Sequence, residues 1–249
     1  MKVLKKKDLS DAGRMACLYG STGVGKTTSI LQSSPDPVLY FQTEPRSLKP
    51  SLDAANRPDL KINVAVYESW SGLMDFITNI ANTEKFATVV VDSYSHLMSI
   101  GLSSEIEDQA FEARSVKERE VKPLVNAVKM SIEGYGSLSS HMFRLTAALG
   151  RLSQSGKIVI VTALLAENPK WNRDLSAAPA LKGREFPVNM PGFFDLIGLV
   201  EHRTDSDGNL VFPPRVRFQS PDDSFVAKFT GTGTKTAGPL DITKILTRT

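Results

Sequence analysis

The sequence predicts an α/β domain with a mostly parallel central sheet flanked by helices. Short apolar runs rich in β-branched residues alternate with helical patterns through most of the chain, which is the order expected of parallel β-α-β units. The C-terminal part instead carries strand patterns joined by a polar turn, so we expect antiparallel strands there. A glycine-rich segment between the first strand and the first helix supports the same fold class.

The composition is that of one domain of this class. Of the 249 residues, 41% are hydrophobic and 23% are charged, enough to bury a core and keep the surface hydrated. The single cysteine, Cys17, lies inside the first strand pattern and is expected in the core, so no internal disulfide forms. No apolar run reaches the ~18 residues of a membrane helix, and no signal-peptide pattern is present. We expect a soluble, cytoplasmic protein that does not contact a membrane.

The net charge of +3 permits an anionic partner without requiring one. Part of the excess lies in residues 1–13, which we expect to form a basic arm ahead of a single domain over residues 14–249. A solvated tail is the simpler interpretation of this arm. Its lysines are Lys2, Lys5, Lys6 and Lys7.

The segment from Gly20 to Thr27 fits the phosphate-binding pattern G-x-x-x-x-G-K-[ST] at each fixed position. A strand pattern precedes it and a helical pattern follows, which argues against a chance glycine-serine loop. In such a P-loop the glycines let successive N–H groups face an anion, and the helix adds the positive end of its dipole. We expect Lys26 to reach the β- and γ-phosphates of a nucleotide and Thr27 to hold Mg²⁺. The expected nucleotide-binding residues are Gly20, Ser21, Thr22, Gly23, Val24, Gly25, Lys26, Thr27 and Thr28.

A second strand is predicted over Pro37–Gln42, and Glu44 follows its carboxyl end. Ligands bind at that edge of open α/β sheets. A carboxylate there can orient and polarise the water that attacks a γ-phosphate, which makes Glu44 a candidate catalytic residue beside Lys26. From position alone, an exposed loop glutamate is an equally good interpretation.

A run of apolar, mostly β-branched residues over Phe86–Ser93 predicts a Walker B strand, buried on both faces and ending at Asp92. Asp92 is expected at the carboxyl edge of the sheet, where it holds Mg²⁺ directly or through water. Many buried strands end in aspartate, and the pairing with the upstream P-loop gives this motif its weight. Between the two motifs we expect a strand over Ile62–Val66 and an amphipathic helix from Trp70 to Ala81.

The middle of the chain carries mixed charges over Ser103–Ile132, which predicts a solvated helical surface. A glycine- and serine-rich loop is expected over residues 133–142, with Tyr135 as its aromatic residue. A leucine-rich helix then leads into a strand over Lys157–Thr162.

Residues 166–190 follow no regular pattern, and prolines oppose regular structure there. A long irregular segment in a compact domain is usually functional or disordered. Cations next to an aromatic residue suit single-stranded nucleic acid, because they attract phosphates while bases stack on the ring. A mobile surface loop with incidental charges is the alternative. The candidate residues are Lys170, Trp171, Arg173, Lys182 and Arg184, together with Tyr135.

The C-terminal part is rich in strand patterns. Strands are predicted over Phe193–Val200, Leu210–Phe218 and Phe225–Phe229, with a hairpin turn at Asp205–Asn209. A short closing helix is expected over Leu240–Leu246.

Taken in order, these landmarks resemble the RecA-like recombinase core. The resemblance rests on the P-loop, the strand that ends in Phe41-Gln42-Thr43-Glu44, and the strand Val89-Val90-Val91-Asp92-Ser93. A glycine-rich loop, a helix and a strand follow, and the similarity runs from Arg14 to Phe229. The compact form is similar to the small phage-encoded RecA-like ATPases linked to single-strand annealing.

This resemblance implies a Mg²⁺-dependent ATPase, stimulated by DNA, that acts on single-stranded DNA in recombination or annealing in a bacterial host's cytoplasm. It implies Glu44 as the water-activating glutamate, and residues 133–142 and 166–190 as the first and second DNA-binding loops. It further implies a homo-oligomeric ring or filament, with a single-strand binding or annealing protein as a candidate partner. Basic side chains arrive at the nucleotide from the neighbouring subunit in such assemblies, and the candidates are Arg215, Arg217 and Lys228. Alternating arginines on an exposed strand also occur without any function.

The chain departs from the RecA pattern in two places. RecA has a glutamine after the strand before its second DNA loop, whereas this neighbourhood reads Thr162-Ala163-Leu164-Leu165. Coupling between nucleotide and DNA is therefore either missing or carried by another residue. The long N-terminal polymerisation helix has no counterpart, so we expect the Met1–Ser10 arm or another surface to hold any oligomer.

A second class of function stays open: a nucleotide-gated assembly or binding module that does not touch DNA. A small-molecule kinase is disfavoured, because it would not need a β-rich C-terminal part and two long basic loops. An AAA+ machine is disfavoured because no helical lid domain is predicted after the core.

Overall fold

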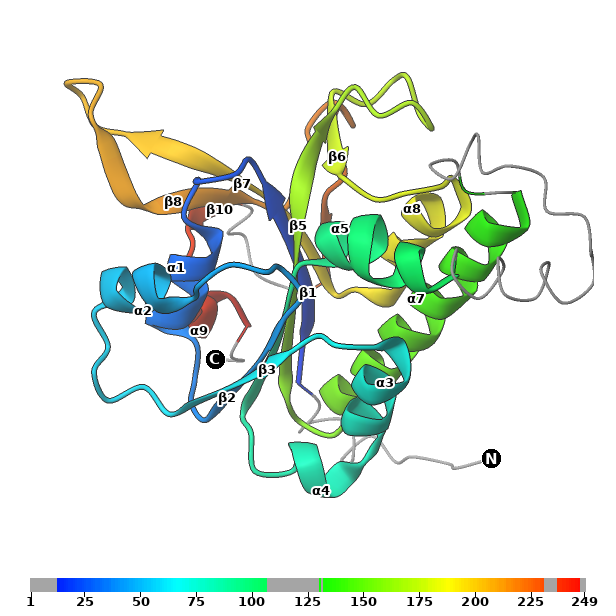
Figure 1. The fold of residues 1–249 in the computed structure, drawn as a ribbon. Coiled ribbons are helices and arrows are strands. Elements are labelled where there is room, and N and C mark those ends of the chain that lie inside the picture. Colours follow the sequence, from blue (N-terminus) through cyan, green and yellow to red (C-terminus); the bar gives the residue numbers. More distant parts are fainter. Residues whose placement is uncertain (1–12, 107–129, 131, 231–236, 247–249) are drawn as a thin grey trace, which may run out of the picture.

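The computed structural model describes residues 13–106, 130, 132–230 and 237–246. These residues form a ten-stranded sheet with helices on both faces (Figure 1). The strands are β1 (Met15–Gly20), β2 (Val38–Gln42), β3 (Ile62–Val66), β4 (Thr88–Asp92), β5 (Ile158–Glu167), β6 (Ala177–Pro179), β7 (Leu196–Thr204), β8 (Leu210–Arg217), β9 (Lys228–Phe229) and β10 (Ala237–Pro239).

The helices are mostly short apart from one. They are α1 (Lys26–Ser33), α2 (Lys49–Ala55), α3 (Trp70–Thr78), α4 (Ile80–Thr83), α5 (Tyr94–His96), α7 (Ile132–Gln154), α8 (Glu185–Asn189) and α9 (Ile242–Leu246). A π-helical segment spans Leu97–Gly101, and a 3₁₀ segment spans Met190–Phe193.

The strand order is β10-β8-β7-β1-β5-β4-β2-β3, with β6 paired to β5 and β9 to β7. The pairs among β7, β1, β5, β4, β2 and β3 are parallel, whereas β8, β10, β6 and β9 pair antiparallel with their neighbours. The predicted fold class, a mostly parallel α/β sheet with antiparallel strands toward the C-terminus, is confirmed. Strand β5 lies between β1 and β4 and is parallel to both. The P-loop after β1 and Asp92 at the end of β4 therefore lie at the same edge of the sheet, one on each side of β5.

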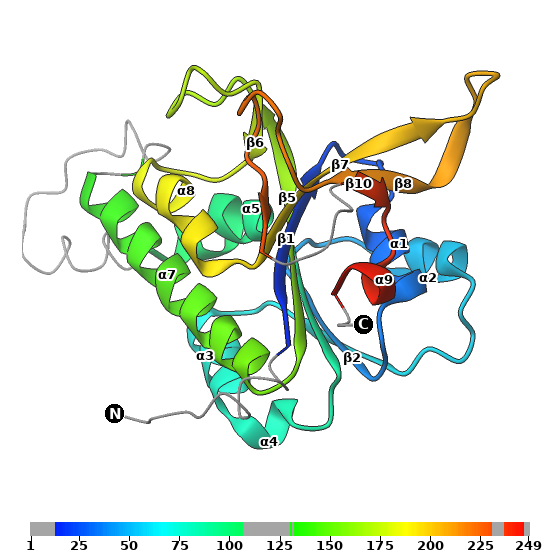
Figure 2. The same cartoon turned by 180° about the vertical axis from the view of Figure 1, so that it is seen from behind.

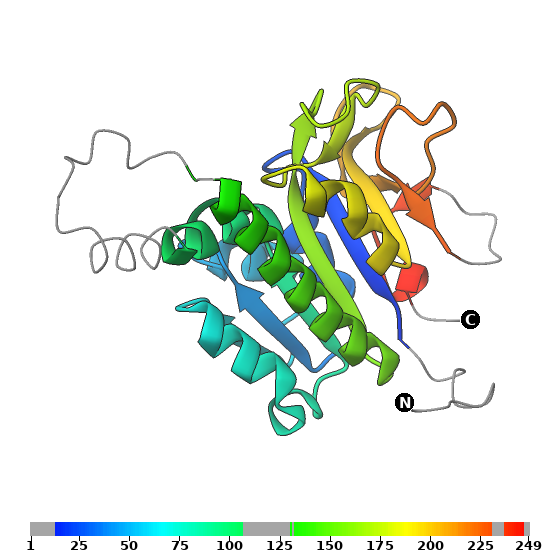
Figure 3. The same ribbon diagram turned by 90° about the vertical axis from the view of Figure 1, so that its right-hand side faces the viewer.

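Two apolar cores lie on opposite faces of the sheet. Successive side chains of a strand point to opposite faces, so Cys17 and Tyr19 enter one core while Ala16 and Leu18 enter the other. Helices α3, α5, α7 and α8 cover the first face, and α1, α2 and α9 cover the second (Figures 2 and 3). A strand buried on both faces needs apolar residues at nearly every position, which explains the continuous apolar runs of β1 and β4.

Several local predictions are confirmed at their expected residues. Helix α3 begins after Ser69, whose side chain accepts a hydrogen bond from the Gly72 N–H, although the helix ends earlier than expected, at Thr78. The turn between β7 and β8 is held by the Asp205 carboxylate, which accepts from the N–H groups of Asp207 and Asn209 at 2.9 Å each. Both features follow from short polar side chains that bond to nearby backbone.

The expected loop over residues 133–142 is wrong, because this segment forms the beginning of α7. Leu138, Met142, Leu145 and Leu149 recur at helical spacing and are fully buried in the first core. Their burial outweighs the helix-weakening effect of glycine, about 1 kcal/mol for each residue. Composition alone therefore misled the prediction.

Residues 166–190 are also more regular than expected. Strand β5 continues to Glu167, β6 folds back on it in antiparallel register, and α8 follows. The irregular part shrinks to the β5–β6 connection and the segment before α8. The expected arm over residues 1–13 lies outside the described residues except for Gly13, and most of the expected helical surface at Ser103–Ile132 lies outside them too.

Candidate nucleotide site

The P-loop runs from the end of β1 to the start of α1, and its backbone requires glycine. Gly23 and Gly25 have φ values of +78° and +94°, a left-handed region that disfavours other residues. A Cβ at Gly20 would lie 2.3 Å from the Val200 carbonyl oxygen on β7. The loop therefore passes close to the neighbouring strand, and its glycines permit the curled backbone in which successive N–H groups can face an anion.

Lys26 lies at the first position of α1 and is buried. Its ammonium group donates hydrogen bonds to the carbonyl oxygens of Gly20 and Ser21, at 2.8 and 2.9 Å. Burial lowers the pKa of Lys26 to about 8, while the negative charges of Asp92 and Glu44 act in the opposite direction. The charge thus sits inside the loop whose backbone would surround phosphate groups.

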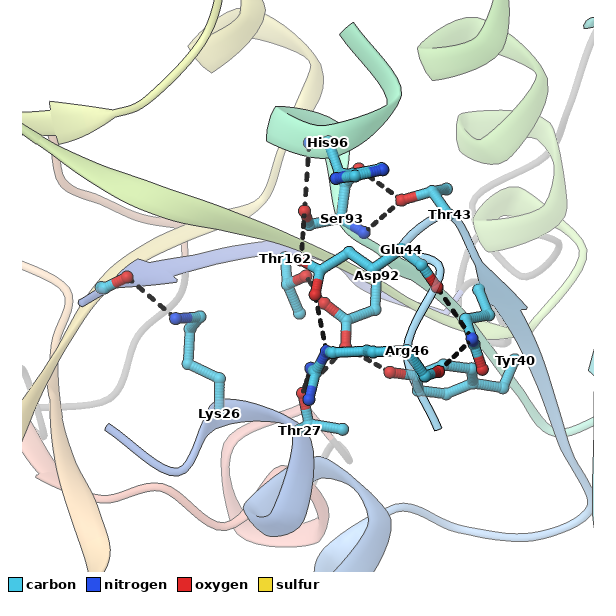
Figure 4. A network of polar contacts seen from close by, with 12 residues as sticks. Lys26, Thr27, Tyr40, Thr43, Glu44, Arg46, Asp92, Ser93, His96 and Thr162 are labelled. Carbon is cyan, nitrogen blue, oxygen red and sulfur yellow. Dashed lines mark hydrogen bonds and ion pairs between the residues drawn. The ribbon is translucent and has the colours of Figure 1, made fainter. Parts of the chain in front are cut away.

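Asp92 ends β4 and is 5% exposed. Its carboxylate accepts hydrogen bonds from three hydroxyl groups on three different elements (Figure 4). Thr27 of α1 donates to Oδ2 at 2.8 Å, Tyr40 of β2 donates to the same oxygen, and Thr162 of β5 donates to Oδ1. The hydroxyl groups fix the orientation of this buried carboxylate at the sheet edge.

Glu44 follows β2 and is held by two partners. Its Oε2 accepts a hydrogen bond from Arg46 Nε at 2.6 Å, and its Oε1 accepts from the Ser93 hydroxyl at 3.2 Å. Arg46 Nη2 lies 3.4 Å from Thr27 Oγ1 and 3.8 Å from Asp92 Oδ2. The guanidinium of Arg46 therefore stands between the two carboxylates.

The short segment after β2 is tied to the end of β4 by its backbone. The Thr43 N–H donates to the Asp92 carbonyl oxygen at 2.9 Å, and the Thr43 hydroxyl accepts from the Ser93 N–H at 2.7 Å. The Gln42 side-chain amide donates to the carbonyl oxygens of Glu44 and Arg46. These bonds place Glu44 at a defined distance from Asp92.

The arrangement brings together Lys26, Thr27, Glu44 and Asp92, as the sequence predicted. Tyr40, Thr162 and Arg46 also belong to the site and were missed. A tyrosine and a threonine within apolar strands next to the strand ending in Asp92 were a usable signal for the first two. No sequence pattern pointed to Arg46, because it lies four residues after the end of β2 and a predicted strand does not fix the position of a residue that far beyond its end.

The residues present fit a magnesium–nucleotide complex. Within the described ranges, no cluster of three or more His, Cys, Asp or Glu side chains could hold a metal ion by itself. A hydroxyl and a carboxylate at hydrogen-bond distance, beside a loop of N–H groups, instead suit a Mg²⁺ whose other ligands are phosphate oxygens and water. Thr27 and Asp92 are the residues that would hold it.

A family model described as an AAA domain matches residues 12–230. The chain belongs to this AAA domain family. In the part of the chain that the structure describes, only β10 and the five-residue helix α9 follow β9, so no helical lid domain follows the core there. No curated protein matches the sequence.

Two solved structures are similar in fold to this AAA-domain chain. A KaiC-like protein from the hyperthermophilic archaeon Pyrococcus horikoshii OT3 is 14% identical, with 83% of this chain and 78% of that chain covered and a TM-score of 0.45. The flagellar accessory protein FlaH from Methanocaldococcus jannaschii is 13% identical, with 91% and 84% covered and a TM-score of 0.45.

The candidate DNA-binding residues of the AAA-domain chain fall into two groups. Tyr135, in the first turns of α7, is 39% exposed, and a Cβ at Gly183 would lie 3.7 Å from its ring. Lys182 and Arg184 flank that glycine, so the two predicted segments meet here. Lys182 Nζ donates to the Ser99 carbonyl oxygen at 3.1 Å. The second group, Lys170, Trp171 and Arg173, lies apart in the β5–β6 connection.

Of the basic residues expected to act on a neighbouring subunit, two make contacts within the chain. Arg217 forms a two-pronged ion pair with Glu201, with both N–O distances at 2.7 Å, and lies over the Phe225 ring. Lys228 donates to the Pro191 carbonyl oxygen at 2.9 Å. Arg215 is exposed on β8. Among the helices within the described ranges, none is long and apolar enough to cross a membrane.

Proposed function

We propose that this protein binds and hydrolyses ATP with Mg²⁺, and that it acts on single-stranded DNA in recombination or annealing of the phage type. One observation carries the ATPase proposal: Lys26 and Thr27 of α1, Glu44 after β2 and Asp92 at the end of β4 come from three separate segments and converge at one edge of the sheet. Membership of the AAA domain family supports it.

Each residue has a defined role in this proposal. Lys26 and the P-loop N–H groups neutralise and orient the phosphates, and Thr27 and Asp92 hold the metal ion. A bound Mg²⁺ supplies Lewis-acid stabilisation of the charge that develops on the phosphate oxygens. Glu44 orients the attacking water through a carboxylate oxygen. Tyr40 and Thr162 keep the Asp92 carboxylate in one orientation, because a fixed charge needs no reorganisation during the reaction.

The ATPase proposal is tested with Lys26→Ala and Glu44→Gln. We expect Lys26→Ala to lose nucleotide binding, and Glu44→Gln to bind ATP normally while phosphate release falls ~100-fold or more, since it loses the group that orients water. Glu68→Gln, an exposed glutamate outside the site, is the matched control and should hydrolyse ATP normally. Loss of ATP binding in Glu44→Gln would contradict the role given to Glu44.

The DNA proposal rests on Tyr135 and its surroundings. The exposed Tyr135 ring lies next to Gly183, whose neighbours in the sequence are Lys182 and Arg184. A ring in this setting is suited to stacking a base while the cations attract the DNA phosphates. A homo-oligomer in which Arg215 reaches the neighbouring subunit's nucleotide is part of the same proposal. The competing function is a nucleotide-gated assembly module, and the bond from Lys182 to Ser99 favours it by engaging one of these cations.

Fluorescence anisotropy with a labelled oligonucleotide, with and without ATP and Mg²⁺, separates the two functions. Binding that weakens as salt rises supports the DNA proposal, and Tyr135→Ala should weaken it ~10-fold because a stacked base is lost. Lys61→Ala, which removes an exposed cation outside both segments, is the control. Flat anisotropy at low salt in both conditions would leave only the assembly module.

A further inference from the structure

Arg46 occupies the centre of the candidate site, although no motif assigns it a role. Its Nε lies 2.6 Å from Glu44 Oε2, and its Nη2 lies 3.4 Å from Thr27 Oγ1 and 3.8 Å from Asp92 Oδ2. The partners of this guanidinium include both residues that would hold Mg²⁺ and the residue that would orient water. Figure 4 shows the side chain reaching across from the segment after β2.

The position of Arg46 between the two carboxylates has an electrostatic explanation. Glu44 and Asp92 place two carboxylates at one sheet edge, and like charges at short range repel unless a cation lies between them. In the protein alone the guanidinium supplies that charge. A metal ion held by Thr27 and Asp92 would supply it instead, and two cations at one place repel each other. Arg46 and the metal ion are therefore alternative occupants of the same position.

The side chain of Arg46 is free to make this exchange. Its backbone is fixed by the hydrogen bond from the Gln42 amide to the Arg46 carbonyl oxygen, but its side chain is 51% exposed. Within the described residues, its side-chain hydrogen bonds and ion pairs are all with the site residues Thr27, Glu44 and Asp92. A planar guanidinium binds phosphate as well as carboxylate, so a phosphate oxygen can replace the contacts that the metal ion removes.

We propose that Arg46 holds Glu44 in an inactive state in the protein alone and binds the terminal phosphate when Mg²⁺ and ATP bind. In doing so it gives up its contacts with Glu44, Thr27 and Asp92. This inference rests on the proposed ATPase function. In the protein alone both Glu44 oxygens are engaged, Oε2 by Arg46 and Oε1 by Ser93. Departure of the guanidinium frees Oε2 to accept a hydrogen bond from water. Glu44 thus becomes competent only when a third phosphate is present.

The test compares equilibrium binding of a non-hydrolysable ATP analogue with that of ADP, both with Mg²⁺, by calorimetry. In Arg46→Ala we expect affinity for the analogue to fall ~10- to 100-fold, because charge-assisted hydrogen bonds to phosphate are lost. Affinity for ADP should stay within about twofold, because ADP has no terminal phosphate for this residue to bind. Arg46→Lys keeps the positive charge but lacks the planar guanidinium with its paired donors. Its affinity for the analogue should therefore lie between those of the wild type and Arg46→Ala.

A magnesium titration supplies the second readout. Because Arg46 no longer competes for Thr27 and Asp92, Arg46→Ala should need less Mg²⁺ than the wild type for half-maximal ADP binding. Arg151→Ala, which removes an exposed arginine near the end of α7, is the matched control and should change neither measurement.

The possible failures are distinguishable. If Arg46→Ala weakens both nucleotides equally, or neither, and only lowers the thermal unfolding temperature of the protein alone, Arg46 is a structural partner of Glu44 and the inference is wrong. If Lys26→Ala leaves binding of both nucleotides intact, the proposed ATPase function fails instead, whatever Arg46 does.

Discussion

The nucleotide site and the candidate DNA surface are built in different ways. The site gathers side chains from the ends of β2 and β4, from β5 and from the start of α1, and each is held by hydrogen bonds to the others. The candidate DNA surface combines the first turns of α7, the segment before α8 and a separate connection after β5. Strand pairing sets the relative positions of β2, β4 and β5, from which most of the first set comes, whereas helix packing and connections place the second.

The contrast predicts that changes in the site are costly and do not spread to the DNA surface. Asp92→Asn is the strongest test, because it keeps the shape of the side chain and removes the charge that would hold Mg²⁺. We expect ATP hydrolysis to fall ~100- to 1000-fold, by analogy with the loss of other preorganised electrostatic groups. DNA binding without nucleotide should be unchanged in anisotropy. An equal loss of DNA affinity would mean that the two regions are one site.

The same contrast explains what the sequence could predict. Lys26, Thr27 and Asp92 follow from a motif tied to a strand and a helix, and the register of a buried parallel sheet leaves them little freedom. The predicted strand over Ile62–Val66 is confirmed without change. These successes share one cause: an apolar strand pattern determines both the element and the edge at which its last residue lies.

The failures have a different cause. The start of α7 was predicted as a loop because glycine and serine are poor helix formers, yet Leu138 and Met142 are buried in the core that the sheet provides. Arg46 was missed because its position depends on side-chain charges contributed by Glu44 and Asp92 from two segments. Neither tertiary burial nor charge balance between distant segments can be read from a local pattern.

The titration of Lys26 predicts a pH dependence of ATP affinity, an effect of intermediate size. Its folded pKa of about 8 lies below the ordinary lysine value of 10.5, so between these values the unfolded chain binds more protons and the free energy of unfolding rises with pH. A bound phosphate favours the charged form, so ATP affinity should fall up to ~10-fold for each pH unit above 8. Calorimetry at pH 9 in two buffers that differ in ionisation enthalpy should detect proton uptake on binding.

The matched condition for this test is pH 7, where Lys26 is already charged and its contribution to proton uptake should vanish. Burial raises the pKa of the Tyr40 hydroxyl, which also lies in the site, so that group stays protonated across this range. Equal proton uptake at pH 7 and pH 9 would show that another group carries the effect.

The smallest expected effect is the most informative about how the two regions communicate. Thr162 donates to Asp92 Oδ1 from β5, and β5 continues directly into the connection that carries Lys170, Trp171 and Arg173. Thr162→Val keeps the side-chain shape and removes one hydrogen bond, which should weaken Mg²⁺-dependent ATP binding only ~3- to 10-fold. If β5 transmits the state of the site, this variant should also lose most of the DNA stimulation of ATP hydrolysis.

Tyr94→Phe is the matched control for Thr162→Val. It removes a buried hydroxyl whose partner is Thr146, on α7 and outside the site, so it should lower the thermal unfolding temperature without changing stimulation by DNA. Thr162 lies in the neighbourhood where the RecA pattern has its coupling glutamine, and its bond to Asp92 gives it a physical route to that role. Full DNA stimulation in Thr162→Val would show that the bond only holds Asp92 in place, and that the two regions work independently.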